Sequence, residues 1–558
     1  MAGISPGAAE APDSSSMARP AAGVAGRAIF FGQSPSDVSG SPLRRAADRL
    51  LDVAPLVTTL LLLAVYPLLR YLLRDPFPAE LFRFLFICFW VGFLILNLVR
   101  AHKTRQAILA NLEVDWLGRV RARDLPLSHY AIFMPLKDEG NRHVLAQTFR
   151  SVERLRYPRS LVTLIPIVEA EDRVTLEQLR EIVPAFAGRM QVAPFVYPAA
   201  GLPVKCKATS VSTAGRWLSA RVAQGDFRPG PGGVKVLIID ADTILHPQDL
   251  ALRDLTHAEE DAAARRAGLR GVVLQSLTTY TANYWKVPML PRLHNTGFVL
   301  YQMGKMQTRG DYLVLGPGTS VDLAAFQDVD YFEPNRHNED MQFRYKVVME
   351  GYRVAPLKLP TWGQAPLTTR ESWGQIARWA RGAVDAKFVV RYRRKTNERF
   401  GLVRAKTFLA IRALLANAMP PLTVLLPAQL ILISWISPCV KELWPAPIFV
   451  SPDVLALKLA GKSLCVSPMA AFNLVFQTIV LTAATLLGMV VVPHTMQPII
   501  YQPTPRRWRR ARKFGEWFRL VFSPINLHHY FLMATAQLYT QGKLALGLPI
   551  AHTPVTRK

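Results

Sequence analysis

Two long apolar segments lie near the start of the chain. Residues 53–73 carry a single charge, Arg70, and residues 84–99 carry none. A helix needs roughly 20 predominantly apolar residues to cross the hydrocarbon core of a bilayer, and arginine near its end can snorkel to the interface. The pattern therefore predicts two transmembrane helices within residues 46–104, joined by a short turn at 74–80. A buried pair of soluble helices is the alternative, and two consecutive segments this uniform argue against it.

Between residues 105 and 406, short apolar runs alternate with helical patterns. Four of these runs have the length and composition of buried strands: "YAIFMPL", "TLIPIV", "VKVLIID" and "GVVLQSL". Each is followed by a polar loop or by a helical pattern, and this alternation is typical of α/β layers. We therefore expect residues 105–406 to form an α/β domain with a mainly parallel sheet.

Apolar segments return after residue 406. Within residues 407–495 we expect an interfacial helix followed by two further spans, at residues 419–438 and 470–492. Residues 520–541 are also apolar, but they contain Pro524 and two histidines. In the basic region 496–558 this favours an interfacial or re-entrant helix, with a fifth span as the alternative. Residues 1–45, rich in alanine, glycine, serine and proline, predict a disordered tail.

The basic residues predict how these segments are oriented. The chain has 67 Lys and Arg against 40 Asp and Glu, a formal net charge of +27. Basic clusters lie at one side of the predicted spans, and the loops at the other side nearly lack them. Because cytoplasmic loops carry the excess of Lys and Arg, we expect a multi-pass protein of the inner (plasma) membrane, in contact with lipids, with a cytoplasmic central domain. Nucleic acid is not an expected partner, since zinc spacings and aromatic-rich basic strand motifs are missing.

Two carboxylates, Asp240 and Asp242, follow the run "VKVLIID" directly. Open α/β sheets bind ligands at the carboxyl ends of their strands. Two carboxylates two residues apart on such a bend can converge on one hard divalent cation, which keeps open positions for substrate phosphate. A helix N-cap or a solvated turn is the alternative for Asp-x-Asp alone. The position favours a site for a metal and a diphosphate.

Other predicted strands also end in acidic residues. Asp138 and Glu139 follow the first run, and the sequence "EAED", which contains Glu169 and Asp172, follows the second. Lys207 precedes a predicted helix and could contact a phosphate or a base. Each of these could belong to an ordinary surface loop, but several acidic strand ends on one sheet edge favour a binding site.

Two later groups of polar residues lie on predicted helices. Glu339 and Asp340 begin an amphipathic helix, where acidic residues also occur simply because they complement the helix dipole. Gln375, Arg378 and Trp379 fall on neighbouring faces of another helix. An interfacial tryptophan anchor and a membrane-surface arginine are the alternative for this second group.

Taken in order, these motifs resemble those of the membrane-embedded, inverting glycosyltransferases of family 2, which include cellulose, chitin and hyaluronan synthases. The motifs are Pro-x-x-Asp-Glu, a second acidic strand end, Lys-x-x-Ala/Ser, Asp-x-Asp, Glu-Asp and Gln-x-x-Arg-Trp, and they extend over residues 131–391. The last motif, following Glu-Asp, is the specific part. The sequence departs from the pattern at "EAED", Ser212 and Asn338, and it has no clear gating-loop sequence. Donor identity and processivity therefore stay open.

The resemblance implies a fold and a set of roles. The fold would be a nucleotide-sugar-binding domain of GT-A type, flanked by transmembrane helices. Asp340 would be the general base, and Asp242, with Asp240, would ligate Mg²⁺ or Mn²⁺. The other roles would be base and ribose binding by Asp138, Glu139 and Glu169 or Asp172, diphosphate contacts by Lys207 and Asp240, and diphosphate and acceptor contacts by Glu339, Gln375, Arg378 and Trp379.

The implied reaction is transfer of a sugar from a UDP- or GDP-linked donor to a membrane-associated acceptor, either a polysaccharide chain or a lipid-linked sugar. It would serve cell-surface or extracellular polysaccharide synthesis, with export proteins as further partners. One carboxylate base without a second nucleophile is the arrangement for direct displacement, and hence for inversion. A non-catalytic membrane scaffold or sugar-nucleotide sensor of the same fold is the alternative. A transporter is disfavoured, because the predicted spans contain no acidic residues.

Overall fold

The computed structural model describes residues 42–72, 76–199, 202, 206–308, 312–333 and 339–383, with short pieces after residue 410. The chain divides into two compact units. The first unit contains residues 1–38, 115–262 and 316–339, and the second contains residues 39–114, 263–315 and 340–558. All predicted donor-side carboxylates fall in the first unit.

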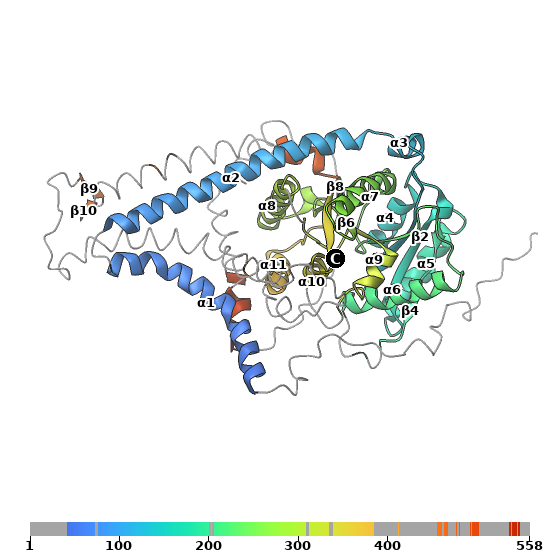
Figure 1. Ribbon diagram of the computed structural model, residues 1–558, viewed down its shortest axis with the longest axis horizontal. Helices are drawn as coiled ribbons and strands as arrows, with labels where there is room; N and C mark the ends of the chain where they lie inside the picture. The colour runs from blue at the N-terminus through green and yellow to red at the C-terminus, as the bar shows by residue number, and fades with distance from the viewer. Residues whose placement is uncertain are drawn as a thin grey trace, which may run out of the picture. The chain divides into compact units, whose positions relative to one another are not determined.

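The first unit is built on a mixed sheet (Figure 1). β2 pairs in parallel with β1, β3 and β4. β1 also pairs in parallel with β5, and β5 pairs antiparallel with β7. The strands are β1 (His129–Pro135), β2 (Val162–Glu169), β3 (Gln191–Val192), β4 (Phe195–Tyr197), β5 (Val234–Ile238) and β7 (Thr319–Asp322). The sheet interior is fully buried at Ile132, Phe133 and Val236, which explains why these strands are continuous apolar runs.

Helices connect the parallel strands of this unit, as crossover connections require. α4 (Arg142–Glu153), α5 (Arg173–Ile182) and α6 (Lys207–Ala223) make these connections. The other helices are α3 (Trp116–Ala122), α7 (Asp249–Arg266) and α9 (Leu323–Asp328), with short 3₁₀ turns η3 (Arg159–Leu161) and η4 (Val183–Phe186). α4 starts at the N-cap Asn141, whose side chain accepts a hydrogen bond from the Val144 amide.

The second unit pairs β6 (Gly271–Thr279) in parallel with β8 (Tyr352–Trp362). The register shifts after Ser276, opposite Leu357 to Pro360 of β8, where a proline cannot donate a ladder hydrogen bond. The other elements are α1 (Pro42–Leu72), α2 (Pro76–Leu112), η5 (Tyr284–Lys286), α8 (Met289–Lys305), α10 (Glu339–Met349), α11 (Thr369–Ala383), β9 (Leu455–Leu459), β10 (Lys462–Val466) and η7 (Gln497–Ile499). α10 begins at the boundary between the units.

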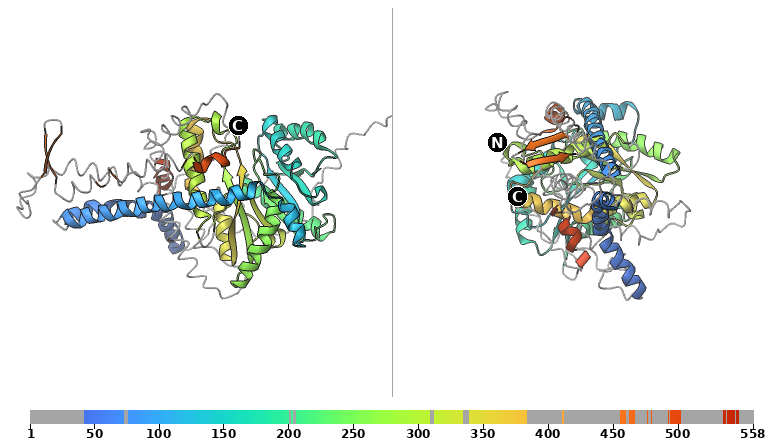
Figure 2. Two further views of the ribbon diagram at one scale, coloured as in Figure 1. Left: turned by 90° about the horizontal axis from the view of Figure 1, so that it is seen from above. Right: turned by 90° about the vertical axis from the view of Figure 1, so that its left-hand side faces the viewer.

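The first two predicted spans coincide with α1 and α2, the two long helices in Figure 2. α2 packs on α8, where Thr104 Oγ1 donates to the Met303 carbonyl at 2.7 Å, and on β8, where Asn111 Nδ2 donates to the Lys358 carbonyl at 2.9 Å. Over the part of the chain that the structure describes, there is no helix with the length and apolar character needed to traverse a bilayer. The flanking transmembrane helices are therefore not confirmed.

Several other predictions fall where the structure gives little or no description. Of the predicted disordered tail at 1–45, residues 1–41 lie outside the described residues, whereas residues 42–45 are helical, because α1 begins at Pro42. The segment 419–438 also lies outside the described residues. Of residues 470–492 and 520–541 only isolated positions are described. By contrast, all four predicted strands are confirmed, as β1, β2, β5 and β6. The sheet is also mainly parallel, as expected, among the described strands.

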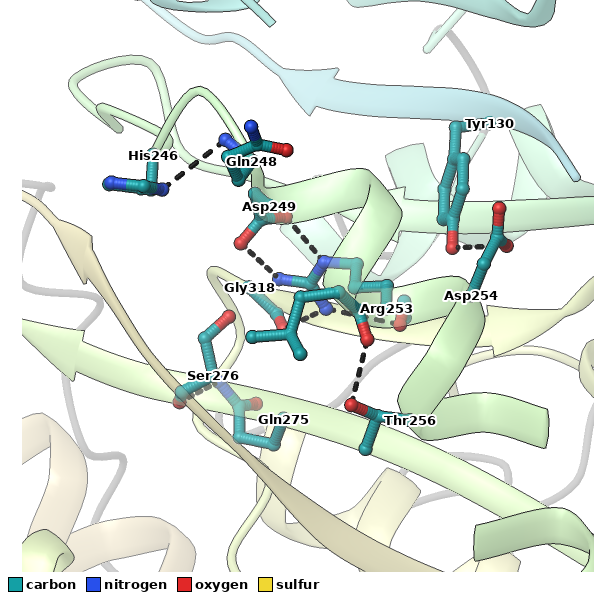
Figure 3. Close-up of polar contacts among 12 residues, drawn as sticks. Tyr130, His246, Gln248, Asp249, Arg253, Asp254, Thr256, Gln275, Ser276 and Gly318 are labelled. Carbon is teal, nitrogen blue, oxygen red and sulfur yellow. Dashed lines mark hydrogen bonds and ion pairs between the residues drawn. The ribbon is translucent and has the colours of Figure 1, made fainter. Parts of the chain in front are cut away.

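A buried polar network lies beneath the sheet of the first unit. Asp254 of α7 accepts a hydrogen bond from the Tyr130 hydroxyl group at 2.9 Å (Figure 3). It also accepts hydrogen bonds from the Tyr157 hydroxyl group and from the Ser128 amide, the latter at 3.3 Å. Burial raises the pKa of Asp254 above its ordinary value, although these donors oppose the shift. The network joins β1 to α7 through groups that are each buried with a partner.

His257, one turn further along α7, makes acid instability an expected property of this unit. Burial lowers the pKa of His257 well below its ordinary 6.5, and Lys235 and Arg253 lower it further. The unfolded chain therefore binds this proton more tightly than the folded chain does. The contribution of His257 to stability is present above pH 6.5 and is lost as the pH falls, by about 1.4 kcal/mol per pH unit.

Thermal unfolding at pH 7.5 and pH 5.5 measures this effect. The wild-type midpoint is expected to fall more between the two pH values than that of His257→Gln. Asp254 has the opposite sign, because a raised pKa removes stability as the pH rises, but it is present in both proteins and cancels in the comparison. His143→Gln is the matched control, since His143 is exposed on α4. Equal pH dependence in all three proteins would contradict the assignment.

Candidate donor site and motif helix

The carboxyl ends of β1, β2 and β5 meet at one edge of the sheet, because these strands run parallel. Asp138 and Glu139 follow the end of β1, and Glu169 is the last residue of β2. Asp240 comes two residues after β5 ends. The acidic residues that the sequence singled out therefore lie on a common edge, as the predicted parallel sheet requires.

Lys207 and Asp240 form the central contact of this edge. Lys207 is the first residue of α6, and its Nζ lies 2.6 Å from Asp240 Oδ1. Both side chains are partly accessible, at 23% for Lys207 and 35% for Asp240. The pair thus places a cation and a carboxylate side by side, where solvent or a ligand can reach both.

The backbone of the Asp240–Asp242 segment is held from several sides. The Asp240 amide donates to Thr243 Oγ1 at 2.8 Å, and the Thr243 amide returns a bond to the Asp240 carbonyl at 3.0 Å. From α4, Thr148 Oγ1 donates to the Ala241 carbonyl at 2.6 Å. Asp242 itself is buried, with 6% of its surface exposed. The segment is therefore fixed before any ligand binds.

The chemistry of these donors fits one kind of cation site. Among the described residues, no three His, Cys, Asp or Glu side chains gather in a way that could hold a metal ion. Asp240 and Asp242 supply two carboxylates, of which Asp240 is paired with Lys207. Magnesium-type ions are commonly held by one or two carboxylates, with substrate phosphates and water completing the octahedron. The residues fit such a substrate-completed site.

Asp172 acts within the protein as the N-cap of α5. Its Oδ1 accepts the Thr175 amide at 3.1 Å, and its Oδ2 accepts the Asp138 amide at 2.7 Å and Thr175 Oγ1 at 2.6 Å. The Glu139 amide donates to Thr175 Oγ1 at 2.9 Å. Asp138 has a positive φ of 53°, which aspartate tolerates better than most residues. Asp172 therefore shapes the loop that presents Asp138 and Glu139.

Glu169, the other residue predicted to bind the base or ribose, lies at the end of β2. It is buried, and Lys137 Nζ lies 3.4 Å from its Oε1. Tyr197 ends the neighbouring strand β4, and its hydroxyl is 2.7 Å from Ser210 Oγ of α6. Burial raises the pKa of Tyr197, so its hydroxyl stays neutral. The sequence analysis did not identify Lys137 and Tyr197 as neighbours of this edge. Their only distinguishing feature in the sequence is that they lie at or just after the end of a strand.

The Glu339–Asp340 and Gln-x-x-Arg-Trp motifs lie on helices, as predicted. Glu339 and Asp340 open α10, and both are partly buried. Gln375 and Trp379 lie one turn apart on α11, while the Arg378 side chain is outside the described part of the structure. Glu339 is assigned to the first unit, whereas Asp340, Gln375 and Trp379 belong to the second.

Trp379 belongs to an aromatic cluster in the second unit. Its ring centroid lies 4.7 Å from that of Phe298, 5.6 Å from His294 and 5.7 Å from Tyr280. Tyr280 follows the end of β6, and His294 and Phe298 are four residues apart on α8. Sequence reasoning identified Trp379 alone, because the other three rings join it only through tertiary packing.

Two solved structures have low similarity to this chain in sequence and in shape. A mannosyltransferase, PcManGT, from Pyrobaculum calidifontis, solved with GDP-Man and Mn²⁺, is 13% identical, with a TM-score of 0.37 over 70% of this chain and 99% of that one. TarS residues 1–349 from S. aureus, solved with UDP-GlcNAc, are 14% identical, with a TM-score of 0.31 over 71% of this chain and 90% of that one. A search of curated protein sequences finds no significant match.

A family profile matches the part of the chain that holds most of the motifs. The matched residues, 235–492, include Asp240, Asp242, Asp340, Gln375 and Trp379. The match begins within β5, so it does not include the acidic residues at the ends of β1 and β2. The family is described as glycosyl transferase family group 2, and residues 235–492 of this chain are similar to it.

Proposed function

We propose that this protein is an inverting glycosyltransferase with a domain of GT-A type. It transfers a sugar from a nucleotide-diphosphate donor to a membrane-associated acceptor. One observation carries the proposal: Lys207 and Asp240 are paired at the same strand edge as Asp242. The similarity of residues 235–492 to family group 2 glycosyltransferases supports the same conclusion.

The donor lies along the edge of the sheet in this proposal. Its base and ribose contact Glu169, Asp138 and Glu139, at the ends of β2 and β1. Lys207 and Asp240 contact the diphosphate, which brings negative charge to a lysine that is already positioned. A bound Mg²⁺ or Mn²⁺, held by Asp242 with Asp240, would neutralise charge on the departing diphosphate. The order of the strands, β2, β1 and β5, therefore follows the order of base, ribose and diphosphate in the donor.

The acceptor side is assigned to residues of the later motifs. Asp340 takes the proton of the attacking hydroxyl group, a role that requires hydrogen-bond reach in the complex with substrate. Glu339, Gln375 and Arg378 contact the diphosphate or the acceptor. The exposed part of Trp379, with Tyr280 and Phe298, offers aromatic surface to a sugar ring. A single base, without a covalent nucleophile, gives inversion at the anomeric carbon.

The proposed location is the inner (plasma) membrane, with the catalytic domain in the cytoplasm. The net charge of +27 suits an anionic lipid surface. Large apolar side chains are exposed on α1 and α2, among them Leu61 at 64% and Phe89 at 59%. Large exposed apolar side chains that lie together on a surface are typical of contacts with a partner protein or with lipid. The acceptor would be a polysaccharide chain or a lipid-linked sugar, and export proteins would be further partners.

Release of nucleoside diphosphate from a panel of UDP- and GDP-linked sugars tests the proposal. Membranes that contain the protein are expected to release nucleoside diphosphate from at least one donor, beyond membranes without it. EDTA is expected to stop the release, and Mg²⁺ or Mn²⁺ to restore it. Binding of a nucleotide sugar without release from any donor would instead support a scaffold or sensor. Full activity in EDTA would contradict the metal assignment.

A further inference from the structure

The segment that carries Asp240 and Asp242 starts where β5 ends, at Ile238, and finishes where α7 begins, at Asp249. Both of its ends are joined to one residue, Gly318, which precedes β7. The Gly318 amide donates to the Ile238 carbonyl at 2.8 Å. The Gly318 carbonyl accepts from Arg253 Nη1 at 3.0 Å, and Arg253 in turn binds Asp249.

Arg253 makes this connection with a fixed geometry. Its Nε donates to Asp249 Oδ2 at 2.5 Å and its Nη2 donates to Asp249 Oδ1 at 3.3 Å, so the guanidinium group grips the carboxylate at two points (Figure 3). Nη1 is left for the Gly318 carbonyl and for Ser320 Oγ, at 3.1 Å. A planar fork of this kind fixes direction as well as distance.

Gly318 is the residue that the connection needs. Its φ of +83° lies in the left-handed region, where a side chain would be strained, and Gly316 has a φ of +82°. This conformation lets the amide of Gly318 face β5 while its carbonyl faces α7. The antiparallel register of β7, with Thr319 opposite Ile238, places the turn directly beside the start of the Asp240 segment.

The complete burial of the Arg253–Asp249 ion pair indicates that the pair holds its neighbours in position. Arg253 and Asp249 have 0% of their side-chain surface exposed. Removing two charges from water costs about as much as their attraction returns, so a buried pair is weak evidence for stability. A pair that is fully hydrogen-bonded does, however, hold its neighbours in one arrangement. Its neighbours here are the two ends of the segment that carries both carboxylates.

We propose that Arg253 is a positioning residue for the cation and diphosphate site. Acting through Asp249 and Gly318, it closes residues 238–249 into a rigid loop and so fixes where Asp242 points. Arg253 touches neither the cation nor the substrate in this arrangement. The inference rests on the proposed function, because it assumes that Asp242 is a metal ligand.

Arg253→Lys tests the inference, since lysine keeps the charge beside Asp249 and loses the fork. The dissociation constant of Mn²⁺, titrated calorimetrically with saturating nucleoside diphosphate, is expected to rise about tenfold, the lower end of the range for residues that orient metal ligands. Binding of nucleoside diphosphate in EDTA is expected to stay at the wild-type level. Turnover is expected to recover when Mn²⁺ is raised in proportion. Arg266→Lys, exposed near the end of the same helix, is the matched control.

Gly318→Ala gives a second route to the same readouts, because it strains the joining residue and leaves Arg253 in place. Amide exchange of the peptides that cover residues 238–249 is expected to quicken in both variants and to stay unchanged in Arg266→Lys. An unchanged Mn²⁺ constant in Arg253→Lys would overturn the inference. So would a parallel loss of all binding that extra Mn²⁺ cannot restore, since that indicates a merely structural role. Failure of the proposed function gives a different result, because the wild type would then release no nucleoside diphosphate from any donor. The amide-exchange experiment would still show whether Arg253 and Gly318 hold the loop at residues 238–249.

Discussion

Replacing Asp340 with asparagine is expected to lower sugar transfer on the order of 10²–10⁴-fold, while nucleotide-sugar binding stays near the wild-type level. General base catalysis contributes about this factor in other enzymes, and asparagine cannot accept the proton of the attacking hydroxyl group. The change keeps the size and hydrogen-bonding capacity of the side chain at the start of α10. The loss corresponds to about 3–5 kcal/mol of the activation barrier.

The measurement combines initial rates of nucleoside diphosphate release with calorimetric binding of the nucleotide sugar. Asp124→Asn is a matched control, because Asp124 is exposed and its φ of 48° suits asparagine equally well. Its rates and affinity are expected to equal those of the wild type. Full transfer by Asp340→Asn would remove Asp340 from its role as base. Lost binding together with lost transfer would show that Asp340 acts on the donor.

Asp242→Asn is expected to reduce turnover on the order of 10²–10³-fold, the cost of removing one preorganised electrostatic group at the centre where charge develops. The neutral amide is a weaker ligand for a hard divalent cation than a carboxylate is. Because Asp242 is buried, water cannot readily replace its missing charge. The activity that remains is expected to need higher concentrations of Mg²⁺ or Mn²⁺ than the wild type does.

Metal titrations of turnover, run for wild type, Asp242→Asn and Asp124→Asn, measure this second effect. Nucleoside diphosphate binding in EDTA serves as the folding control, since neither substitution changes Lys207 or Asp240, which form the ion pair. If the rate of Asp242→Asn fell with an unchanged metal dependence, the carboxylate would act by some means other than holding the cation. An unchanged rate would exclude Asp242 from the site.

The sheet could be predicted to the extent that its strands are buried on both faces. β1, β2, β5 and β6 are continuous apolar runs, and each was expected from the pattern alone. β7 is four residues long and reads Thr-Ser-Val-Asp, so it has no apolar run that would predict a buried strand. β8 contains two prolines, Pro356 and Pro360, which weaken its strand pattern; the register shift opposite them accommodates the interruption.

The candidate site could be predicted residue by residue, but not as a set of contacts. Asp240 and Asp172 look alike in the sequence, since both are acidic residues that follow a strand. In the structure Asp240 pairs with Lys207, whereas Asp172 caps α5 and accepts the Asp138 amide. Asp249 and Arg253, four residues apart, have the spacing of an ordinary surface ion pair on a helix. Their complete burial gives them a different task.

The sequence by itself determined part of the secondary structure and the chemical groups: which apolar runs are buried strands, which strand ends carry carboxylates, and where the Glu-Asp and Gln-x-x-Arg-Trp motifs lie. Those properties follow from local composition and spacing. The tertiary structure alone decided what each group faces. The partner of Asp240, the bond from the Asp138 amide to Asp172, the rings around Trp379 and the hydrogen bonds through Gly318 all join residues distant in the chain. The charge, burial and hydrogen bonds of a side chain depend on those neighbours, and so does its chemistry.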